Sequence, residues 1–324
     1  MNVLLLGATG LLGHNVLLRL MDEGHHVVVL VRRVKGICLS QAGWETVVGS
    51  PLDYAVLSKA AEGCDAIVNC AGTTDMSLRH YEDFLPVNRD LCGLLVRLMD
   101  ELGIGTLVHT STVNTIGYGS SDSPAGESAP MQPPFKGSFY ADSKREGEQV
   151  VLSVAKEGRH VVVVNPGFMV GPYDVKPSSG RMLLAAYRKP LMLAPKGGKA
   201  FVHVGDVAQV IVNALTQGRN GDRYIAVNGH ACLSIKELYQ LQAEVCGYRQ
   251  RVFEVPDGLF LLAGKAGDLL RWMGVRTQVS TRNVRQLLVR EYYDNGHALR
   301  DLGIKETPIA DAIGKFHKWR EKRL

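Results

Sequence analysis

Met1-Asn-Val-Leu-Leu-Leu-Gly7-Ala-Thr-Gly10-Leu-Leu-Gly13 is the stretch that decides the fold of this chain. The apolar run 3–6 predicts a short parallel strand that is covered on both faces. The glycines have separate roles: Gly7 allows a tight turn, Gly10 lets the backbone approach a pyrophosphate, and Gly13 lets a helix pack closely on the strand. Free N–H groups at the start of that helix favour phosphate binding. The stretch therefore predicts a dinucleotide-binding turn.

The residues after the glycines supply the context that such a turn requires. An amphipathic helix runs to Leu20, and a second buried strand follows at 26–31. Arg32 comes directly after that strand, with Arg33 beside it. A carboxylate at this position would accept hydrogen bonds from the ribose 2′-hydroxyl of NAD, whereas a cation attracts the 2′-phosphate of NADP. We therefore expect NADP as the cofactor, with NAD as the alternative.

The rest of the first half alternates strands and helices. Strands are expected at 47–49, 66–69, 106–109 and 160–165, and helices at 54–62, 81–103 and 141–157. Six strands separated by helices predict an α/β fold with a Rossmann-type, doubly wound parallel sheet. Such a sheet binds its ligand at the carboxyl ends of the strands.

The composition changes in the second half, where prolines punctuate a loop-rich stretch. A strand at 201–204 and a helix at 207–215 follow, and the remainder reads as helical pieces broken by Gly and Pro. We therefore expect a smaller, mostly helical C-terminal cap domain that binds the substrate and is interleaved with the sheet. The expected boundaries are 1–165 with 200–228 for the NAD(P)-binding Rossmann domain, and 166–199 with 229–324 for the cap.

The overall composition is that of an ordinary globular protein. The 324 residues are 46% hydrophobic and 21% charged, with a formal net charge of +5, so an ample core is expected and a disordered chain is excluded. A basic cluster with interleaved aromatic residues lies at 315–323, where a solvated face of a terminal helix is favoured over a nucleic-acid patch. The six cysteines show no metal-ligand spacing, which predicts reduced thiols and no metal site.

No segment has the pattern of a signal peptide or a bilayer span. The glycine turn interrupts the apolar N-terminal run. The stretch 259–275 comes closest to a span, but Lys265, Asp268 and Arg271 interrupt it. We expect a cytoplasmic protein with a small-molecule substrate and with no membrane or nucleic-acid partner; a homodimer stays open.

The chemistry is expected between residues 106 and 144. Tyr140-Ala-Asp-Ser-Lys144 places a phenol and an ammonium group on one face of a helix. A tyrosine pKa near 10 makes a poor acid or base at neutral pH, and an adjacent lysine cation lowers that pKa. Thr110-Ser111-Thr112 supplies hydroxyl groups just past a strand end, where an active site should lie. Together these residues predict an acid/base site.

With these features the chain resembles the extended branch of the short-chain dehydrogenase/reductase superfamily. The motifs that carry the resemblance are Gly7-x-x-Gly10-x-x-Gly13, Asn69-Cys-Ala-Gly72, Val87-Asn88, Val108-His-Thr-Ser-Thr112 with Gly117, Tyr140-x-x-x-Lys144, Asn165-Pro-Gly-Phe-Met-Val-Gly-Pro172 and Val202-His-Val-Gly-Asp206-Val-Ala208. Within the branch the chain is most similar to bacterial dihydroflavonol-reductase-like and hopanoid-associated epimerase-like proteins. That nearer likeness is carried by Asp174-Val-Lys-Pro177-Ser-Ser-Gly-Arg181 and Gly218-Arg-Asn-Gly-Asp-Arg-Tyr224.

The resemblance implies roles for individual residues. Tyr140 would be the acid/base, Lys144 would lower its pKa and hold the nicotinamide ribose, and Thr112 would be the hydroxyl partner. Thr110 and Ser111 stay open as alternatives to Thr112. The implied cofactor contacts are Gly7, Thr9, Gly10, Leu11, Leu12, Gly13, Arg32, Cys70, Ala71, Gly72, Thr110, Tyr140, Lys144, Pro166, Gly167 and Val170.

Three positions depart from the family pattern. Gly49-Ser50-Pro51 lacks the usual aspartate that contacts the adenine. Val113-Asn114 stands where dehydratases of the branch carry an Asp-Glu pair, which argues against dehydration. Lys199-Ala200 precedes Phe201 where nucleotide-sugar enzymes have Arg-Asp, and a lysine does not replace a bidentate arginine.

We expect an NADP-dependent oxidoreductase that reduces a carbonyl group on a small organic substrate. The alternative is a nucleotide-sugar epimerase that uses the same tyrosine and lysine, and Arg181, Arg188 and Arg276 of the cap keep it open. The apolar stretches 190–195 and 255–263, read as pocket wall, suit an apolar or modestly polar carbonyl compound better than a nucleotide sugar; the alternative reading of both stretches is simple cap core. A non-catalytic dinucleotide sensor is disfavoured because the tyrosine and the lysine are both present.

Overall fold

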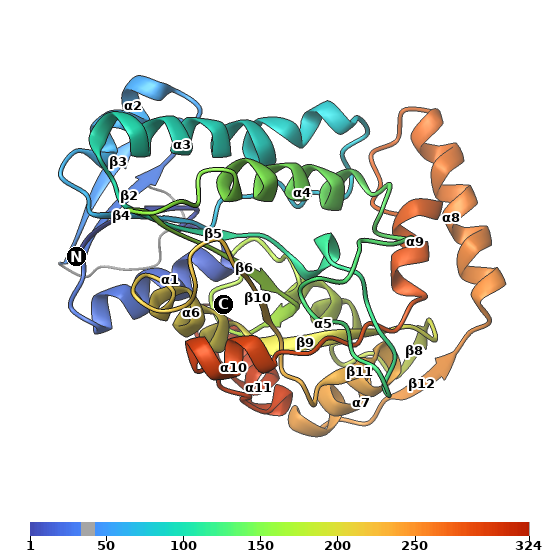
Figure 1. Ribbon diagram of the computed structural model, residues 1–324. Coiled ribbons are helices and arrows are strands. Elements are labelled where there is room, and N and C mark those ends of the chain that lie inside the picture. Colours follow the sequence, from blue (N-terminus) through green and yellow to red (C-terminus); the bar gives the residue numbers. More distant parts are fainter. Residues whose placement is uncertain (34–42, 324) are drawn as a thin grey trace.

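A seven-stranded parallel sheet forms the centre of the computed structural model, which describes residues 1–33 and 43–323 (Figure 1). The strand order is β10-β6-β5-β4-β1-β2-β3. The strands are β1 (Asn2–Leu6), β2 (His26–Val31), β3 (Trp44–Val48), β4 (Ala66–Asn69), β5 (Thr106–Thr110), β6 (His160–Pro166) and β10 (Arg223–Ala226). The order of the chain reverses beside β1, so the crevice for a ligand is expected at the carboxyl ends of β1 and β4.

Helices cover both faces of this sheet, which confirms the doubly wound fold (Figure 1). One face carries α1 (Leu11–Asp22) and α6 (Val204–Asn213), and the other carries α2 (Tyr54–Ala61), α3 (Leu91–Leu102) and α4 (Phe139–Leu152). Apolar side chains point from the strands into both layers, because parallel strands are buried on both faces.

The six expected strands are present, but three details of the sequence prediction were wrong. The strand β10 adds a seventh member beside β6. The expected helix at 81–103 is divided into a 3₁₀ turn η1 (Tyr81–Asp83), a π turn η2 (Pro86–Asp90) and α3. Pro86 explains the division because proline lacks the N–H that a continuous helix would use. The helix expected to reach residue 157 ends at Leu152.

Shorter strands and helices make up the rest of the molecule, outside the main sheet and the helices on its two faces. The strand expected at 201–204 belongs to a separate three-stranded sheet, β11-β9-β7, and a two-stranded sheet pairs β12 with β8. The elements are η3 (Val113–Thr115), β7 (Phe168–Val170), α5 (Gly180–Ala186), β8 (Leu191–Ala194), β9 (Gly198–His203), β11 (Cys232–Ser234), α7 (Ile235–Val245), β12 (Arg251–Glu254), α8 (Asp257–Trp272), α9 (Thr281–Leu287), α10 (Gly296–Leu302) and α11 (Ile309–Glu321). Buried side chains of β7, α5, β8, β9, α7, β12 and α11 make a core of their own, whereas those of α10 belong to the core under the main sheet.

Two apolar stretches that were expected to form pocket wall or cap core lie largely at the surface. In 190–195, Leu191 and Leu193 are 55% and 57% exposed, and in 255–263, Leu259 and Leu262 are 57% and 60% exposed. Apolarity alone does not decide which way a short strand or helix faces, so the expectation of a cap core was wrong for these four side chains. Pro190 and Leu191 line a hollow of about 860 Å³ whose lining does not include Tyr140, and Met192 and Ala194 of the same stretch pack in the cap core.

The remaining surface features agree with the sequence. In the basic cluster 315–323, Phe316 is buried and Trp319 packs against Tyr173, so the aromatic rings are turned toward the protein. The five cysteines in the described residues are free thiols, and Cys38 lies outside those residues. Within the described ranges, no helix is both long and apolar enough to cross a bilayer.

Candidate active site

Glycines shape the turn between β1 and α1. Gly7 has a φ of 84°, and a Cβ there would lie 2.6 Å from the backbone of Cys70. A Cβ at Gly13 would lie 2.2 Å from the carbonyl oxygen of Gly7, so the start of α1 packs directly on the turn. At Gly10 the nearest described atom would be 3.4 Å away, which leaves this side of the turn open.

The start of α1 adds donors to this open side. Within the described part of the chain no side chain caps the helix, and its first turn contains no acidic residue. Its first N–H groups are therefore available to an anion. Thr9 is partly exposed in the turn, whereas Leu11 and Leu12 are buried under it. The turn fits the pyrophosphate of a dinucleotide.

The turns after β4 and β5 continue this edge toward α4. The N–H of Cys70 donates to the carbonyl of Leu6 at 3.0 Å, and its Sγ lies 3.5 Å from Oγ1 of Thr110. The carbonyl of Thr110 accepts a hydrogen bond from Nζ of Lys144 at 2.6 Å. A Cβ at Gly72 would lie 3.7 Å from the same ammonium group. These contacts connect the glycine turn to Lys144 without a break.

Tyr140 and Lys144 lie one turn apart on α4. Burial lowers the pKa of Lys144, which is 3% exposed, and the nearby Cys92 and Glu148 act in the opposite direction. Burial also raises the pKa of Tyr140 to about 12, against a hydrogen bond with Thr112 that lowers it. We expected the lysine to bring the pKa of Tyr140 down. Instead the net shift of the Tyr140 pKa is upward, because burial dominates.

The structure separates the three candidate hydroxyl groups. Hydrogen bonding to the Thr112 side chain acts to lower the pKa of Tyr140, and Oγ1 of Thr112 accepts from the N–H of Asn114 at 3.3 Å. The hydroxyl of Thr110 lies beside a cysteine sulfur. The hydroxyl of Ser111 is buried and has no hydrogen-bond partner among the described residues. Thr112 is therefore the candidate that meets Tyr140.

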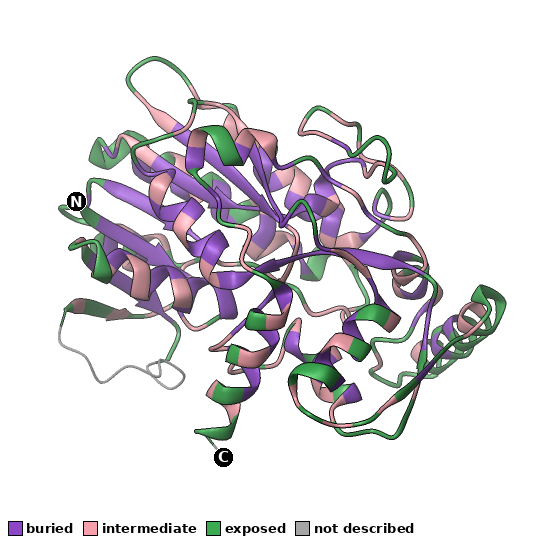
Figure 2. Ribbon diagram, turned by 90° about the horizontal axis from the view of Figure 1, so that it is seen from below, coloured by how far each residue is buried: buried purple, intermediate pink, exposed green. Residues whose placement is uncertain are grey.

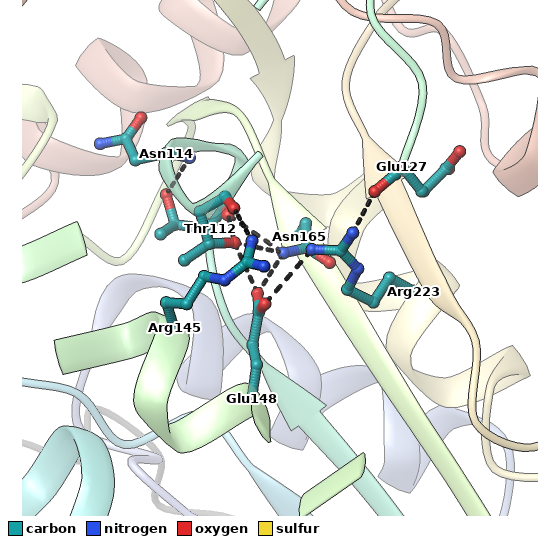
Figure 3. A network of polar contacts seen from close by, with 8 residues as sticks. Thr112, Asn114, Glu127, Arg145, Glu148, Asn165 and Arg223 are labelled. Carbon is teal, nitrogen blue, oxygen red and sulfur yellow. Dashed lines mark hydrogen bonds and ion pairs between the residues drawn. The ribbon is translucent and has the colours of Figure 1, made fainter. Parts of the chain in front are cut away.

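A buried polar network holds the backbone around Thr112 (Figure 3). Nδ2 of Asn165 donates to the carbonyl of Thr112 at 3.0 Å and to Oε1 of Glu148 at 2.6 Å. The hydroxyl of Thr115 also donates to this carboxylate at 2.6 Å, and Nη1 of Arg223 lies 3.5 Å from its other oxygen. Glu148 follows Tyr140 by two helical turns, so it faces the same side of α4.

Sequence reasoning missed Glu148 and Ser143 and gave Asn88 no role. Nδ2 of Asn88 donates to Oγ of Ser143 at 2.9 Å, and its Oδ1 accepts from the N–H of Thr73 at 2.8 Å. This side chain ties the loop after β4 to the helix that carries Lys144. The i, i+4, i+8 spacing of a tyrosine, a lysine and a glutamate was the signal that could have identified Glu148.

The other expected cofactor residues lie along the same edge or behind it. Arg32 is exposed one residue after β2, whose Leu30 pairs with Leu6 of β1. The N–H of Ala71 donates to Oδ1 of Asn69 at 3.0 Å. The segment after β6 is packed more deeply: Pro166 ends that strand, a Cβ at Gly167 would lie 2.4 Å from the carbonyl of Ala200, and the Val170 side chain belongs to the second core.

A small space beside Tyr140 is the candidate substrate pocket. Its lining comes from the loop before η1, the start of α4, and α8 and α9: Met76, Leu78, Phe84, Ser138, Phe139, Tyr140, Arg271, Arg282 and Asn283. The free volume is about 10 Å³, roughly enough for one water molecule. A substrate must therefore displace some of these side chains to bind.

The arginines in this lining are not Arg181, Arg188 and Arg276, the three that kept the epimerase alternative open in the sequence analysis. Arg271 donates to the carbonyls of Met76 and Leu78, and Arg282 stacks 3.6 Å from the ring of Phe139. Of the earlier three, Arg276 pairs with Asp75 and Arg181 bonds the carbonyl of Pro177; neither these two nor Arg188 is in the described pocket lining.

Comparison with known families decides the classification. Residues 3–228 match the model of the NAD dependent epimerase/dehydratase family. The chain belongs to this family. Its members include reductases and epimerases, and the protein is an NAD(P)-dependent enzyme of the extended short-chain dehydrogenase/reductase type.

Individual members of the family resemble the chain over nearly its whole length. A protein provisionally named dihydroflavonol 4-reductase from Synechocystis sp. is 26% identical over 97% of this chain and 92% of its own. Sterol demethylase protein B from Methylococcus capsulatus is 27% identical over 100% of this chain and 99% of its own length. The UDP-glucose 4-epimerase from Thermotoga maritima shares the fold, with a TM-score of 0.80. It is 17% identical in sequence, and the match covers 100% of this chain and 99% of the epimerase chain.

Proposed function

We propose that this epimerase/dehydratase-family protein is an NADP-dependent reductase that converts a ketone of an apolar organic substrate into an alcohol. Tyr140, Lys144 and Thr112 would act at the reacting centre. The observation that carries the proposal is the position of Tyr140 one helical turn from the buried Lys144, whose Nζ donates to the carbonyl of Thr110 at 2.6 Å at the end of β5. Related proteins are named as a dihydroflavonol reductase and a sterol demethylase component, which supports an apolar substrate.

The protein's own residues provide the proton and the orientation. A pKa of about 12 keeps the phenol of Tyr140 protonated at neutral pH. The phenol can therefore donate its proton to the carbonyl oxygen of the substrate. The hydroxyl of Thr112 orients that oxygen. The cation of Lys144, one turn along α4, stabilises the phenolate that remains. NADPH, when bound, supplies the hydride.

The glycine turn and Arg32 would hold the cofactor. The open side of Gly10 and the uncapped start of α1 suit the pyrophosphate. Arg32 adjoins the edge at which β1 and β2 end. In such folds the 2′-phosphate of NADP binds at this edge, and an NAD-selective site would carry a carboxylate where this chain has Arg32. This arrangement supports NADP over NAD.

One buried ion pair favours the reductase over the epimerase. An epimerase must grip a nucleotide diphosphate, and Lys199 occupies the position at which its relatives carry an arginine. Nζ of Lys199 contacts the carboxylate of Glu291 and the carbonyl of Gln286, and both charged side chains are buried. The charge of Lys199 is therefore already neutralised by the protein.

The same proposal divides the chain between cofactor and substrate. Residues 1–165 with 200–228 would bind NADP, and 166–199 with 229–324 would form the substrate cap. The pocket lining supports this division, because Arg271, Arg282 and Asn283 face Tyr140 from the cap segment.

The test is a substrate screen that separates reduction from epimerisation. Purified protein is incubated with NADPH and with steroid ketones, aromatic ketones or nucleotide sugars, while cofactor absorbance and products are followed. We expect NADPH consumption with an equimolar yield of alcohol for an apolar ketone, and a rate at least about a hundredfold lower with Tyr140→Phe. Interconversion of sugar isomers without net NADPH loss, by protein that retains its cofactor, would establish the epimerase instead.

A further inference from the structure

Helix α8 carries its apolar side chains on the outside of the molecule. It lies at the right-hand edge in both views and is largely exposed (Figures 1 and 2). Leu259, Leu262, Leu269, Leu270 and, just after the helix, Met273 are between 43% and 63% exposed. Their spacing puts them on one face of the helix, where the two intervening positions are exposed alanines. A surface helix normally turns its polar face outward, so this orientation is inverted.

Glycines on another face of α8 hold it in this orientation. A Cβ at Gly264 would lie 2.9 Å from Cα of Thr281, and a Cβ at Gly267 would lie 2.3 Å from the carbonyl oxygen of Val279. Only glycine permits so close an approach. The guanidinium of Arg271 adds hydrogen bonds to the loop before η1. Turning the leucines inward would break these contacts, so their exposure is built into the packing.

Basic residues outnumber acidic ones in the segment that carries the apolar face. Residues 249–290 contain eight Lys and Arg against three Asp and Glu, an excess of five that equals the formal net charge of the whole chain. Lys265 on α8 and Arg285 on α9 are both exposed. Trp272, at the end of α8, is 80% exposed. Tryptophan, leucine and a basic fringe are the composition of helices that lie in the membrane interface.

We propose that α8 docks on a membrane that contains anionic lipids, with the Leu259–Met273 face inserted at the level of the upper acyl chains. The helix has 16 residues and so is about 24 Å long. It would lie in the plane of the interface, and Lys265, Asp268 and Arg271, which interrupt the apolar run in sequence, lie off the inserted face. A second copy fits this surface less well, because a two-fold dimer would bring the basic fringe of one copy against the basic fringe of the other.

The position of α8 connects docking to the active site. Arg271 of α8 and Asn283 of α9 line the pocket beside Tyr140. On the reductase function proposed above, a substrate that partitions into the membrane would reach this pocket directly from the lipid phase. The substrate class is then a membrane-soluble ketone.

The docking surface can be tested without any assay of activity. The full-length protein is floated on a density gradient with phosphatidylcholine vesicles, with or without phosphatidylglycerol. We expect co-flotation with the anionic vesicles that weakens as salt is raised. The double variant Leu262→Glu/Leu269→Glu should lower the affinity for anionic vesicles by about tenfold or more, because two apolar side chains are lost from the inserted face and two negative charges are added. Leu102→Glu, at a 39% exposed leucine of α3, is the matched control and should float like the wild type.

The outcomes are distinct. Because Leu262 and Leu269 are exposed, the double variant should keep the far-ultraviolet circular dichroism and melting temperature of the wild type. It should also keep the wild-type kcat/KM on a water-soluble ketone. Absence of flotation, or equal flotation of the double variant, would overturn the proposal. A concentration-dependent dimer that the double variant abolishes, without vesicle binding, would assign the face to a second copy. A protein that floats with the vesicles but consumes no NADPH would contradict only the reductase function and would leave the docking proposal supported.

Discussion

Asn165 donates its side-chain amide to the carboxylate of Glu148 at 2.6 Å, and this bond joins the end of β6 to the middle of α4. The same amide holds the carbonyl of Thr112 at 3.0 Å. On the proposed function, Glu148 would therefore position Thr112 through Asn165 without touching a substrate itself.

Glu148→Gln should impair turnover more than cofactor binding. Replacing the carboxylate by an amide removes one acceptor and leaves Arg223 without its full countercharge, so the backbone of Thr112 should shift. We expect kcat to fall roughly 10- to 100-fold, the cost of a misplacement of about 1 Å, while the Kd for NADPH changes little. Steady-state kinetics and a cofactor titration measure the two effects. Glu157→Gln, at an exposed glutamate, is the control; parallel losses of kcat and NADPH affinity would refute a positioning role.

Gly10 and Gly13 should respond differently to alanine. Gly10 has φ −89° and open space around its missing Cβ, so Gly10→Ala should fold normally and bind NADPH more weakly. A Cβ at Gly13 would lie 2.2 Å from the Gly7 carbonyl, so Gly13→Ala should lower the melting temperature as well. Thermal unfolding with and without NADPH distinguishes the two. Unchanged NADPH affinity in Gly10→Ala would place the pyrophosphate elsewhere.

The sheet and its ligand edge were predictable because their signals are local. The apolar runs 3–6 and 26–31 and the glycines between them specify neighbouring parallel strands, whose carboxyl ends must share an edge. The spacing of Tyr140 and Lys144 likewise places both on one face of α4. The fold class was thereby confirmed, and the assignment of catalytic and cofactor roles stays a prediction.

The features that could not be predicted depend on partners far away in the chain. Lys199 is neutralised by Glu291, which lies 92 residues later. The exposed face of α8 follows from the contact of Gly264 and Gly267 with the segment before α9, and an apolar sequence is equally compatible with a buried face. Pattern and periodicity carry no information about such tertiary contacts.

Arg32→Ala should change cofactor preference. Loss of the guanidinium removes the attraction for the 2′-phosphate, so affinity for NADPH should fall roughly tenfold or more, in the range of a charge-assisted hydrogen bond of about 1.5–3 kcal/mol. Affinity for NADH should hardly change. Fluorescence titration with both cofactors gives the ratio, and Lys59→Ala removes an exposed cation on α2 as the control. Wild-type protein that binds NADH as tightly as NADPH would contradict this assignment.

His14 should make stability fall in mild acid. It is 1% exposed, stacks on Tyr173 at 4.4 Å, and its pKa is lowered from 6.5 to about 4 by burial and then by Arg323. Because the folded pKa lies below the unfolded value, the contribution is complete above pH 6.5 and is lost as the pH falls toward 4. The loss amounts to about 3 kcal/mol. Denaturant unfolding across this range should show a weaker pH dependence in His14→Phe; identical slopes would contradict the assignment.

Tyr140 carries the chemistry in the proposed mechanism, with Lys144 supporting it from one turn further along α4. Tyr140→Phe removes only a hydroxyl, so NADPH should bind nearly as in the wild type, whereas turnover on the reduced ketone should fall by roughly 10²–10⁴, the contribution of a general acid. Lys144→Ala should impair both turnover and NADPH affinity, because the buried ammonium lies at the cofactor edge.

The most direct measurement is the single-turnover rate of Tyr140→Phe with saturating NADPH and the ketone identified by the screen. We predict intact NADPH binding with a rate at least about a hundredfold below that of the wild type. A Tyr140→Phe protein that keeps most of the wild-type rate would contradict the proposed mechanism.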